Sequence, residues 1–229
     1  MKRAFPILGL LTLALLSYAL YEALVAAPTE QTMGNVQRIF YYHVPSAWTA
    51  FLLFLINFVA SVVYLIRRNA KADIVALVAA EVGLVFCTVV LVTGPIWARP
   101  VWGIWWTWDM RLTLTLVLWL IYASYLVLRR FSSGSQTPLI AAVLAVFGAL
   151  DVPLVYFSIW YYRTQHPSPV IGRGGSLDPR MWAVLMINWA AFLCFAFMVC
   201  WSRYRLEHLK REVEETQALE ALLEPRNTR

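Results

Sequence analysis

Residues 74–97 read IVALVAAEVGLVFCTVVLVTGPIW, a run of 24 residues in which Glu81 is the single charged side chain. About 20 apolar residues in a helix cross the hydrocarbon core of a bilayer, so this run predicts a transmembrane helix. Six apolar stretches of comparable length lie at about 5–26, 46–66, 74–97, 112–130, 138–160 and 180–201. The sequence therefore predicts an all-α polytopic membrane protein with six transmembrane helices.

The composition of the whole chain agrees with a protein dissolved in lipid. Of its 229 residues, 61% are apolar and 14% are charged, and the mean hydropathy is +0.64. Ordinary soluble domains have roughly 45–50% apolar and about 25% charged residues. These values exclude a soluble domain, a disordered chain, a coiled coil and a nucleic-acid-binding module. A β-barrel is excluded because the apolar runs are continuous rather than alternating.

The basic residues predict the orientation in the membrane. With the N-terminus inside, 13 Lys and Arg residues fall in the inner segments and 6 in the outer segments, so the positive-inside rule places both termini in the cytoplasm. The first stretch follows Lys2 and Arg3, and we expect a retained helix because it is too long for the apolar part of a signal peptide. We divide the chain into a transmembrane domain, residues 1–201, and a charged cytoplasmic tail, residues 202–229, which we expect to be a short solvated or surface-lying helix.

Two of the three histidines occupy matching places outside the membrane stretches. His43 precedes the second predicted helix and His166 follows the fifth, so both project from the same, outer face. A single interfacial histidine is most often just solvated, but two on one face beside aromatic residues favour a shared ligand. His208 lies in the charged tail, and we expect it to be solvated. The three cysteines, Cys87, Cys194 and Cys200, have no spacing suited to zinc or to a disulfide framework.

The tryptophan-rich segment (residues 97–113, WARPVWGIWWTWDMRLT) lies between the third and fourth predicted helices. Five of the chain's 11 tryptophans fall within residues 97–108. An interfacial aromatic belt would spread tryptophan over many helix ends, whereas this density favours a flat apolar platform for a large planar ligand. The platform residues are Trp102, Trp105, Trp106 and Trp108. Arg99 and Arg111 could pair with carboxylates of that ligand, and Asp109 could hold Arg111 or an indole N–H in place.

The histidine pair and the platform point to one ligand. Two neutral imidazoles beside an indole surface suit the iron of a porphyrin, and the arginines suit its propionates. A site for a metal ion alone is less favoured because no acidic or thiolate group accompanies the histidines. The residues alone therefore favour haem as the ligand.

The run from Trp102 to Thr113 resembles the WWD signature of haem-handling membrane proteins. Within that family the six-helix length, the Tyr42-His43-Val44-Pro45 run and the Trp160-to-His166 run most resemble cytochrome c maturation protein C (CcmC). Two positions depart from the pattern: Pro95 stands in place of a small polar residue, and Asp151 in place of an asparagine.

The resemblance implies a function and partners. It implies a multi-pass protein of the bacterial inner membrane that binds haem b at the periplasmic face, with His43 and His166 as axial ligands. The haem is then passed to a membrane-anchored haem chaperone, CcmE. It also implies a complex with an ABC-type ATPase and permease, CcmA and CcmB, and a one-helix protein, CcmD, within membrane lipid and without nucleic acid. The protein would assist formation of the covalent haem–chaperone adduct rather than act as a self-contained enzyme.

Two alternatives and two buried acids complete the predictions. An electron-transfer cytochrome subunit would place its histidines within helix cores, where the sequence predicts none. A haem-transporting permease would show internal repeats and broken helices, and Pro153 alone breaks a predicted helix interior. Glu81 and Asp151 lie in membrane stretches, where carboxylates are either paired or functional. We expect structural pairing for each, with haem entry or proton movement as the alternative.

Overall fold

The computed structural model describes residues 4–132, 134–162, 164–166 and 177–223. Its elements are helices, with one isolated bridge between Glu30 and Gly34. In chain order they are α1 (Ala4–Tyr21), the π-helix η1 (Glu22–Ala26), the 3-10 helix η2 (Asn35–Ile39), α2 (Phe40–Arg67), α3 (Ala70–Trp102), α4 (Met110–Phe131), α5 (Thr137–Ala149), α6 (Asp151–Tyr161) and α7 (Pro179–Leu223). Several basic residues of the orientation argument lie outside the described residues: Lys2, Arg3, Arg163, Arg173, Arg226 and Arg229.

Six helical segments are long and apolar enough to cross a membrane, which confirms the predicted fold class. They are Ala4–Ala26, Asn35–Arg67, Ala70–Trp102, Met110–Phe131, Thr137–Tyr161 and Pro179–Leu223. Three of them, the second, third and sixth, are longer than the apolar stretches predict. The 33 residues of α3 rise about 50 Å at 1.5 Å per residue, more than the ~30 Å of hydrocarbon.

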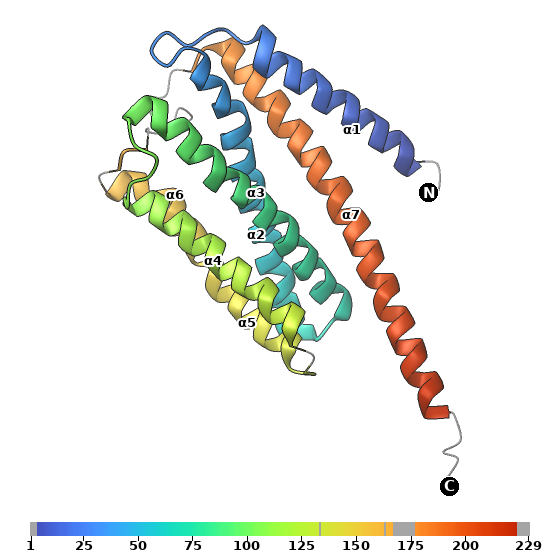
Figure 1. Cartoon of the computed structure of the whole chain (residues 1–229). Coiled ribbons are helices and arrows are strands. Elements are labelled where there is room, and N and C mark those ends of the chain that lie inside the picture. The colour runs from blue at the N-terminus through green and yellow to red at the C-terminus, as the bar shows by residue number, and fades with distance from the viewer. Residues whose placement is uncertain (1–3, 133, 163, 167–176, 224–229) are drawn as a thin grey trace.

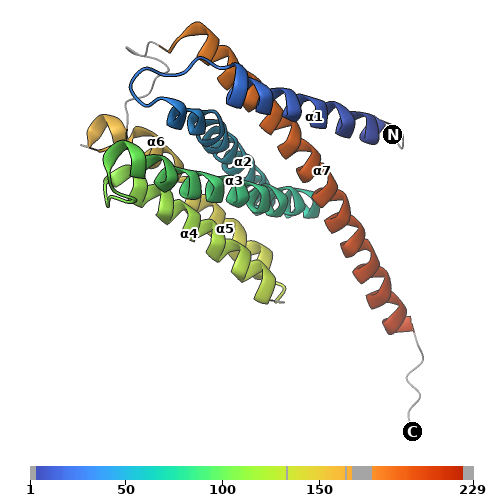
Figure 2. The same ribbon diagram turned by 45° about the horizontal axis from the view of Figure 1, so that its top comes forward.

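The helices are arranged around a central pair, α2 and α3 (Figure 1). The layer of α4, α5 and α6 packs on one side of this pair, and α7 packs on the other. Helix α1 lies against α7, as both views show (Figures 1 and 2). The connections 27–34 and 103–109 lie at one end of the bundle, together with the end of α6 and the start of α7. The short connection 68–69 lies at the other end, together with the end of α4 and the start of α5. The bundle thus gathers its long connections at a single end.

Aromatic stacking and a glycine bring the central helices together. Phe54 of α2 stacks on Tyr122 of α4 with ring centroids 3.7 Å apart and planes 11° apart, and both side chains are fully buried. A Cβ on Gly83 of α3 would lie 2.8 Å from Cε1 of Phe54. No real side chain tolerates that contact, so the glycine lets α3 approach the ring closely.

The fifth membrane segment is broken in its interior. Leu150 separates α5 from α6, and Pro153 has no N–H to donate to the Ala149 carbonyl. Asp151 begins α6 and is buried, and within the described part of the chain its Oδ2 has no hydrogen-bond partner. The pairing expected for Asp151 is therefore not found among these residues.

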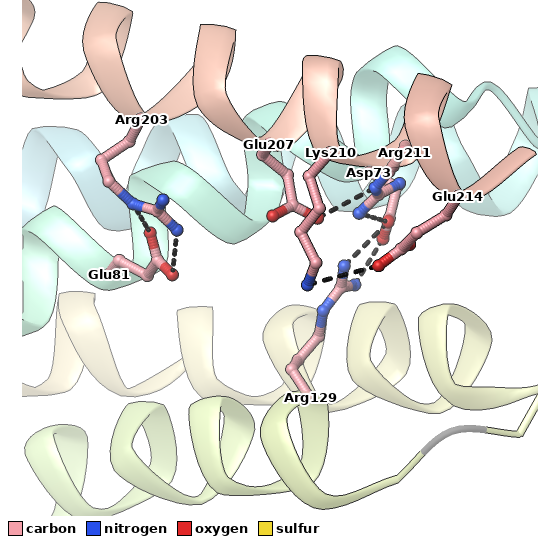
Figure 3. A network of polar contacts seen from close by, with 8 residues as sticks. All are labelled: Asp73, Glu81, Arg129, Arg203, Glu207, Lys210, Arg211 and Glu214. Atoms are coloured by element: carbon pink, nitrogen blue, oxygen red, sulfur yellow. Dashed lines mark hydrogen bonds and ion pairs between the residues drawn. The ribbon is translucent and has the colours of Figure 1, made fainter. Parts of the chain in front are cut away.

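Ion pairs hold α7 to α3 (Figure 3). Arg129 of α4 binds the Asp73 carboxylate through two N–H groups, at 2.5 and 2.8 Å, and Arg211 of α7 reaches the same carboxylate at 2.9 Å. Glu81 accepts two hydrogen bonds of 2.9 Å from Arg203, so this carboxylate is paired as expected. The tail is thus not a separate short helix: α7 continues to Leu223, and its first charged turns bind α3.

Candidate functional site

A large cavity opens among the long connections and reaches down between the helices. Its volume is about 850 Å³. Walls come from α2, α3, α4, α6, the start of α7 and residues 28–33 of the first long connection, and they are mostly apolar. The tryptophan-rich segment contributes three of the lining residues, Trp97, Trp106 and Arg111, together with Leu112. Drug-sized and cofactor-sized ligands bind in cavities of about 300–1,000 Å³, so this one is large enough for a macrocycle.

His43 lies in the first turn of α2 and lines this cavity. The sequence placed it before the helix, but α2 begins at Phe40 because Phe40 and Tyr41 are buried against the neighbouring helices. His43 is 8% exposed. The expectation that His43 precedes the helix is therefore wrong, although the residue sits at the helix end nearest the long connections.

A hydrogen bond fixes the imidazole of His43. Its Nδ1 lies 2.8 Å from Oγ1 of Thr93 in α3, and that hydroxyl donates its own proton to the Val89 carbonyl at 2.7 Å. The hydroxyl therefore accepts the Nδ1–H, which leaves the lone pair of the ring on Nε2. Trp97 packs edge-on to the ring with centroids 5.9 Å apart. An oriented, neutral imidazole of this kind is the usual form of a metal-binding histidine.

His166 follows α6 and reaches the same cavity. Its backbone N–H donates to Oγ1 of Thr164 at 3.0 Å, and the preceding N–H, of Gln165, donates to Oδ2 of Asp109 at 3.2 Å. His43 and His166 also line a small adjoining hollow of about 40 Å³, together with Trp102. The structure thus brings the two histidines, 123 positions apart, to the walls of the same two spaces.

The tryptophans of the segment point in different directions. Gly103 adopts φ +79°, a left-handed conformation that ends α3 and turns the chain. Trp106 lines the large cavity and Trp102 the small hollow, whereas Trp105 and Trp108 are 58% and 75% exposed. Trp108 packs edge-on against Trp106 with centroids 5.8 Å apart. The segment therefore contributes Trp106 to the large cavity and Trp102 to the small hollow.

The two arginines of the segment also differ. Arg111, in the first turn of α4, lines the cavity, and its Nη1 is buried with no hydrogen-bond partner in the described part of the chain. Arg99 is exposed and donates to the Gly103 carbonyl at the end of α3. A buried guanidinium N–H without a partner is costly, so Arg111 is the arginine suited to an anionic group of a ligand.

Asp109 acts as the N-cap of α4. Its Oδ1 accepts the Leu112 N–H at 3.0 Å, and its Oδ2 accepts the Thr107 hydroxyl at 3.1 Å as well as the Gln165 N–H. The sequence suggested Arg111 or an indole as its partner, but these hydrogen bonds are with the backbone and a threonine. His208 lies away from the cavity, 3.3 Å from Glu212 one turn later in α7.

Sequence reasoning missed several residues of the cavity wall. Thr93 could have been identified from the sequence, since it is a polar residue in an apolar run one turn before Trp97. Residues 28–33 and the start of α7, including Met181, carried none, because only the packing of α7 on α2 brings them to the cavity. Among the described residues, no three His, Cys, Asp or Glu side chains gather as a metal site. Two imidazoles in a mostly apolar cavity suit a metal whose other ligands arrive with it.

Comparison with known proteins places these features in a family. The sequence profile for CcmC, described as heme exporter protein C, matches residues 1–219. A heme exporter protein C of Bradyrhizobium diazoefficiens is 35% identical over 96% of this chain and 84% of its own length. One of Haemophilus influenzae is 32% identical over 91% of this chain and 86% of its own length. A cytochrome c biosynthesis ccmC-like mitochondrial protein of Marchantia polymorpha is 32% identical over 78% and 76% of the two chains.

Proposed function

The chain belongs to the CcmC family of haem exporter proteins, and we propose that it binds haem in the cavity lined by His43, His166 and Arg111 and delivers it to the haem chaperone CcmE. Membership makes it a multi-pass membrane protein that handles haem in cytochrome c biogenesis, within a system that has other Ccm components. The remaining details are ours: haem b as cargo, CcmE as acceptor, and CcmA, CcmB and CcmD as partners. We also propose the inner membrane, a site on the periplasmic side and both termini in the cytoplasm.

The observation that carries the proposal is the convergence of three side chains in one apolar space. His43 and His166 line the cavity with Arg111, whose Nη1 has no partner in the described part of the chain. The iron of a porphyrin binds two axial nitrogens, the porphyrin ring packs against apolar walls, and the propionates pair with a cation. The cavity, of about 850 Å³, supplies all of these.

Each residue of the site has a separate role in binding haem. The Thr93 hydroxyl keeps His43 in the tautomer with its lone pair on Nε2. Arg111 binds a carboxylate at the N-terminal turn of α4, where the helix dipole also favours an anion. Trp106 and the apolar walls exclude water. When bound, haem supplies an iron that accepts the lone pairs of the two imidazoles.

Delivery requires that the hold be reversible. His43 is fixed within a helix, whereas His166 lies in the connection between α6 and α7, beside the tryptophan-rich segment. Exposed Trp105 and Trp108 lie on that same segment and offer apolar contact to an incoming protein. We therefore place the approach of CcmE at this end of the bundle, with His166 as the ligand that is released.

The test is transfer from purified protein to purified CcmE. Full-length protein isolated from haem-replete cells should contain haem and lose it to CcmE on mixing, with the covalent adduct measured by mass spectrometry. His166→Ala should reduce the adduct, and His208→Ala, which lies in the tail, should leave it unchanged. Haem-free protein from replete cells, or an adduct unaffected by His166→Ala, would contradict the proposal.

A further inference from the structure

One carboxylate joins the tryptophan-rich segment to the connection that carries His166. Asp109 and Gln165 are 56 positions apart, yet Oδ2 of Asp109 accepts the backbone N–H of Gln165 at 3.2 Å. The same oxygen accepts the Thr107 hydroxyl, and Oδ1 accepts the Leu112 N–H at the start of α4. Asp109 thus fixes the residue directly before His166 to the end of a membrane helix.

We propose that Asp109 is a positioning residue for His166, holding the backbone of Gln165 so that the imidazole stays on the cavity wall. The inference rests on the proposed function, because it treats His166 as an iron ligand. Asp109 itself does not line the cavity, so it acts through Gln165 and touches no ligand. A connection between two helices moves more freely than a helix does, and His43, within α2, needs no such tether.

The chemistry requires a carboxylate rather than an amide. Oδ2 receives two donors, one from Thr107 and one from Gln165, while Oδ1 caps the helix. Asparagine is as good a helix cap as aspartate, so Asp109→Asn keeps the bond from Oδ1 to Leu112. It then presents an NH₂ group to the Gln165 N–H, and two donors cannot bond to each other. This single substitution removes the tether and leaves the cap.

Two further variants separate the tether from its surroundings. Gln165→Pro deletes the donor N–H and leaves Asp109 intact. Thr107→Val deletes the other donor to the same oxygen and leaves the tether, so it is the matched control.

The first measurement is the spin state of ferric haem in the full-length protein. Asp109→Asn and Gln165→Pro should each raise the high-spin fraction several-fold with haem content retained through His43. Added imidazole should restore the low-spin spectrum, since it replaces a misplaced ligand. Thr107→Val should match the wild type. In a His166→Ala background, Asp109→Asn should add nothing, because its effect passes through that histidine.

The second measurement needs no haem. Amide hydrogen exchange of the segment that contains Gln165 should accelerate about tenfold or more in haem-free Asp109→Asn protein, and not in Thr107→Val protein. If His166→Ala changes the spin state while Asp109→Asn and Gln165→Pro do not, the positioning role is wrong and the proposed function stands. If His166→Ala protein has the same spectrum as the wild type, both the ligand assignment and this inference are wrong.

Discussion

Replacing Arg111 with methionine should stabilise the haem-free protein and weaken its binding of haem. Arg111 lines the cavity with an Nη1 that has no partner within the described residues. Methionine has similar length, no charge and no donor, and it suits an apolar wall. The substitution therefore removes an unsatisfied buried group from the empty protein and a carboxylate partner from the complex.

Both magnitudes follow from the one unpaired donor. A buried polar group without a partner costs about 1–3 kcal/mol, so haem-free Arg111→Met protein should be more stable by about that amount. A hydrogen bond to a charged group contributes about 1.5–3 kcal/mol, which corresponds to about 10- to 150-fold weaker haem binding. Thermal unfolding in detergent measures the first effect, and haem titration measures the second.

The identity of the paired group is tested with a modified ligand. Haem dimethyl ester lacks both carboxylates, so wild-type protein should bind it about 10- to 150-fold more weakly than haem. Arg111→Met protein should bind the two ligands with nearly equal affinity, because the partner of the carboxylate is gone. Arg99→Met, on the exposed arginine, is the control and should discriminate as the wild type does. If Arg111→Met still prefers haem to the same degree, Arg111 does not bind the propionates.

Three further predictions test other parts of the account. Gly94→Ala should keep the low-spin haem spectrum, since the new Cβ lies 3.5 Å from the α2 histidine ring. Gly94→Leu should displace that ring and abolish the low-spin spectrum, and absorption spectra of the two variants test both outcomes. Asp73→Ala leaves buried Arg129, and a second, partly exposed arginine, without their anion, which should cost about 3–5 kcal/mol of stability in detergent unfolding; unchanged unfolding would contradict this. Trp106→Ala should weaken haem retention about 2- to 12-fold through a lost aromatic contact, while Trp108→Ala should keep haem content and lower CcmE adduct formation; the reverse pattern would refute the roles assigned to these two tryptophans.

The six membrane segments were predictable because each is a continuous apolar run, and hydrocarbon thickness sets how long such a run must be. The ends of the helices were not. Helix α7 runs without a break to Leu223 because Glu and Arg pairs one turn apart, such as Glu207 with Arg211, support the helix beyond the apolar run. Helix α2 starts early because its first aromatic residues are buried by other helices. Both ends depend on contacts outside the local sequence.

The candidate site was predictable in its residue types and less so in its geometry. Histidines beside aromatic residues and an arginine in a tryptophan-rich segment indicated the chemistry, and His43, His166, Trp106 and Arg111 do line one cavity. The cavity itself depends on how α4 and α6 pack beside α2, which no short motif specifies. The bond from Gln165 to Asp109 spans 56 positions and has no local signature.

The electronic spectrum of the haem complex tests the central claim most directly. Ferric protein purified at full length should show a six-coordinate low-spin spectrum, with both His43 and His166 bound to the iron. His43→Ala and His166→Ala should each convert it to a high-spin form that added imidazole reverses, and the double variant should lose haem during purification. A low-spin spectrum that persists in the double variant would contradict the account, because other residues would then hold the iron.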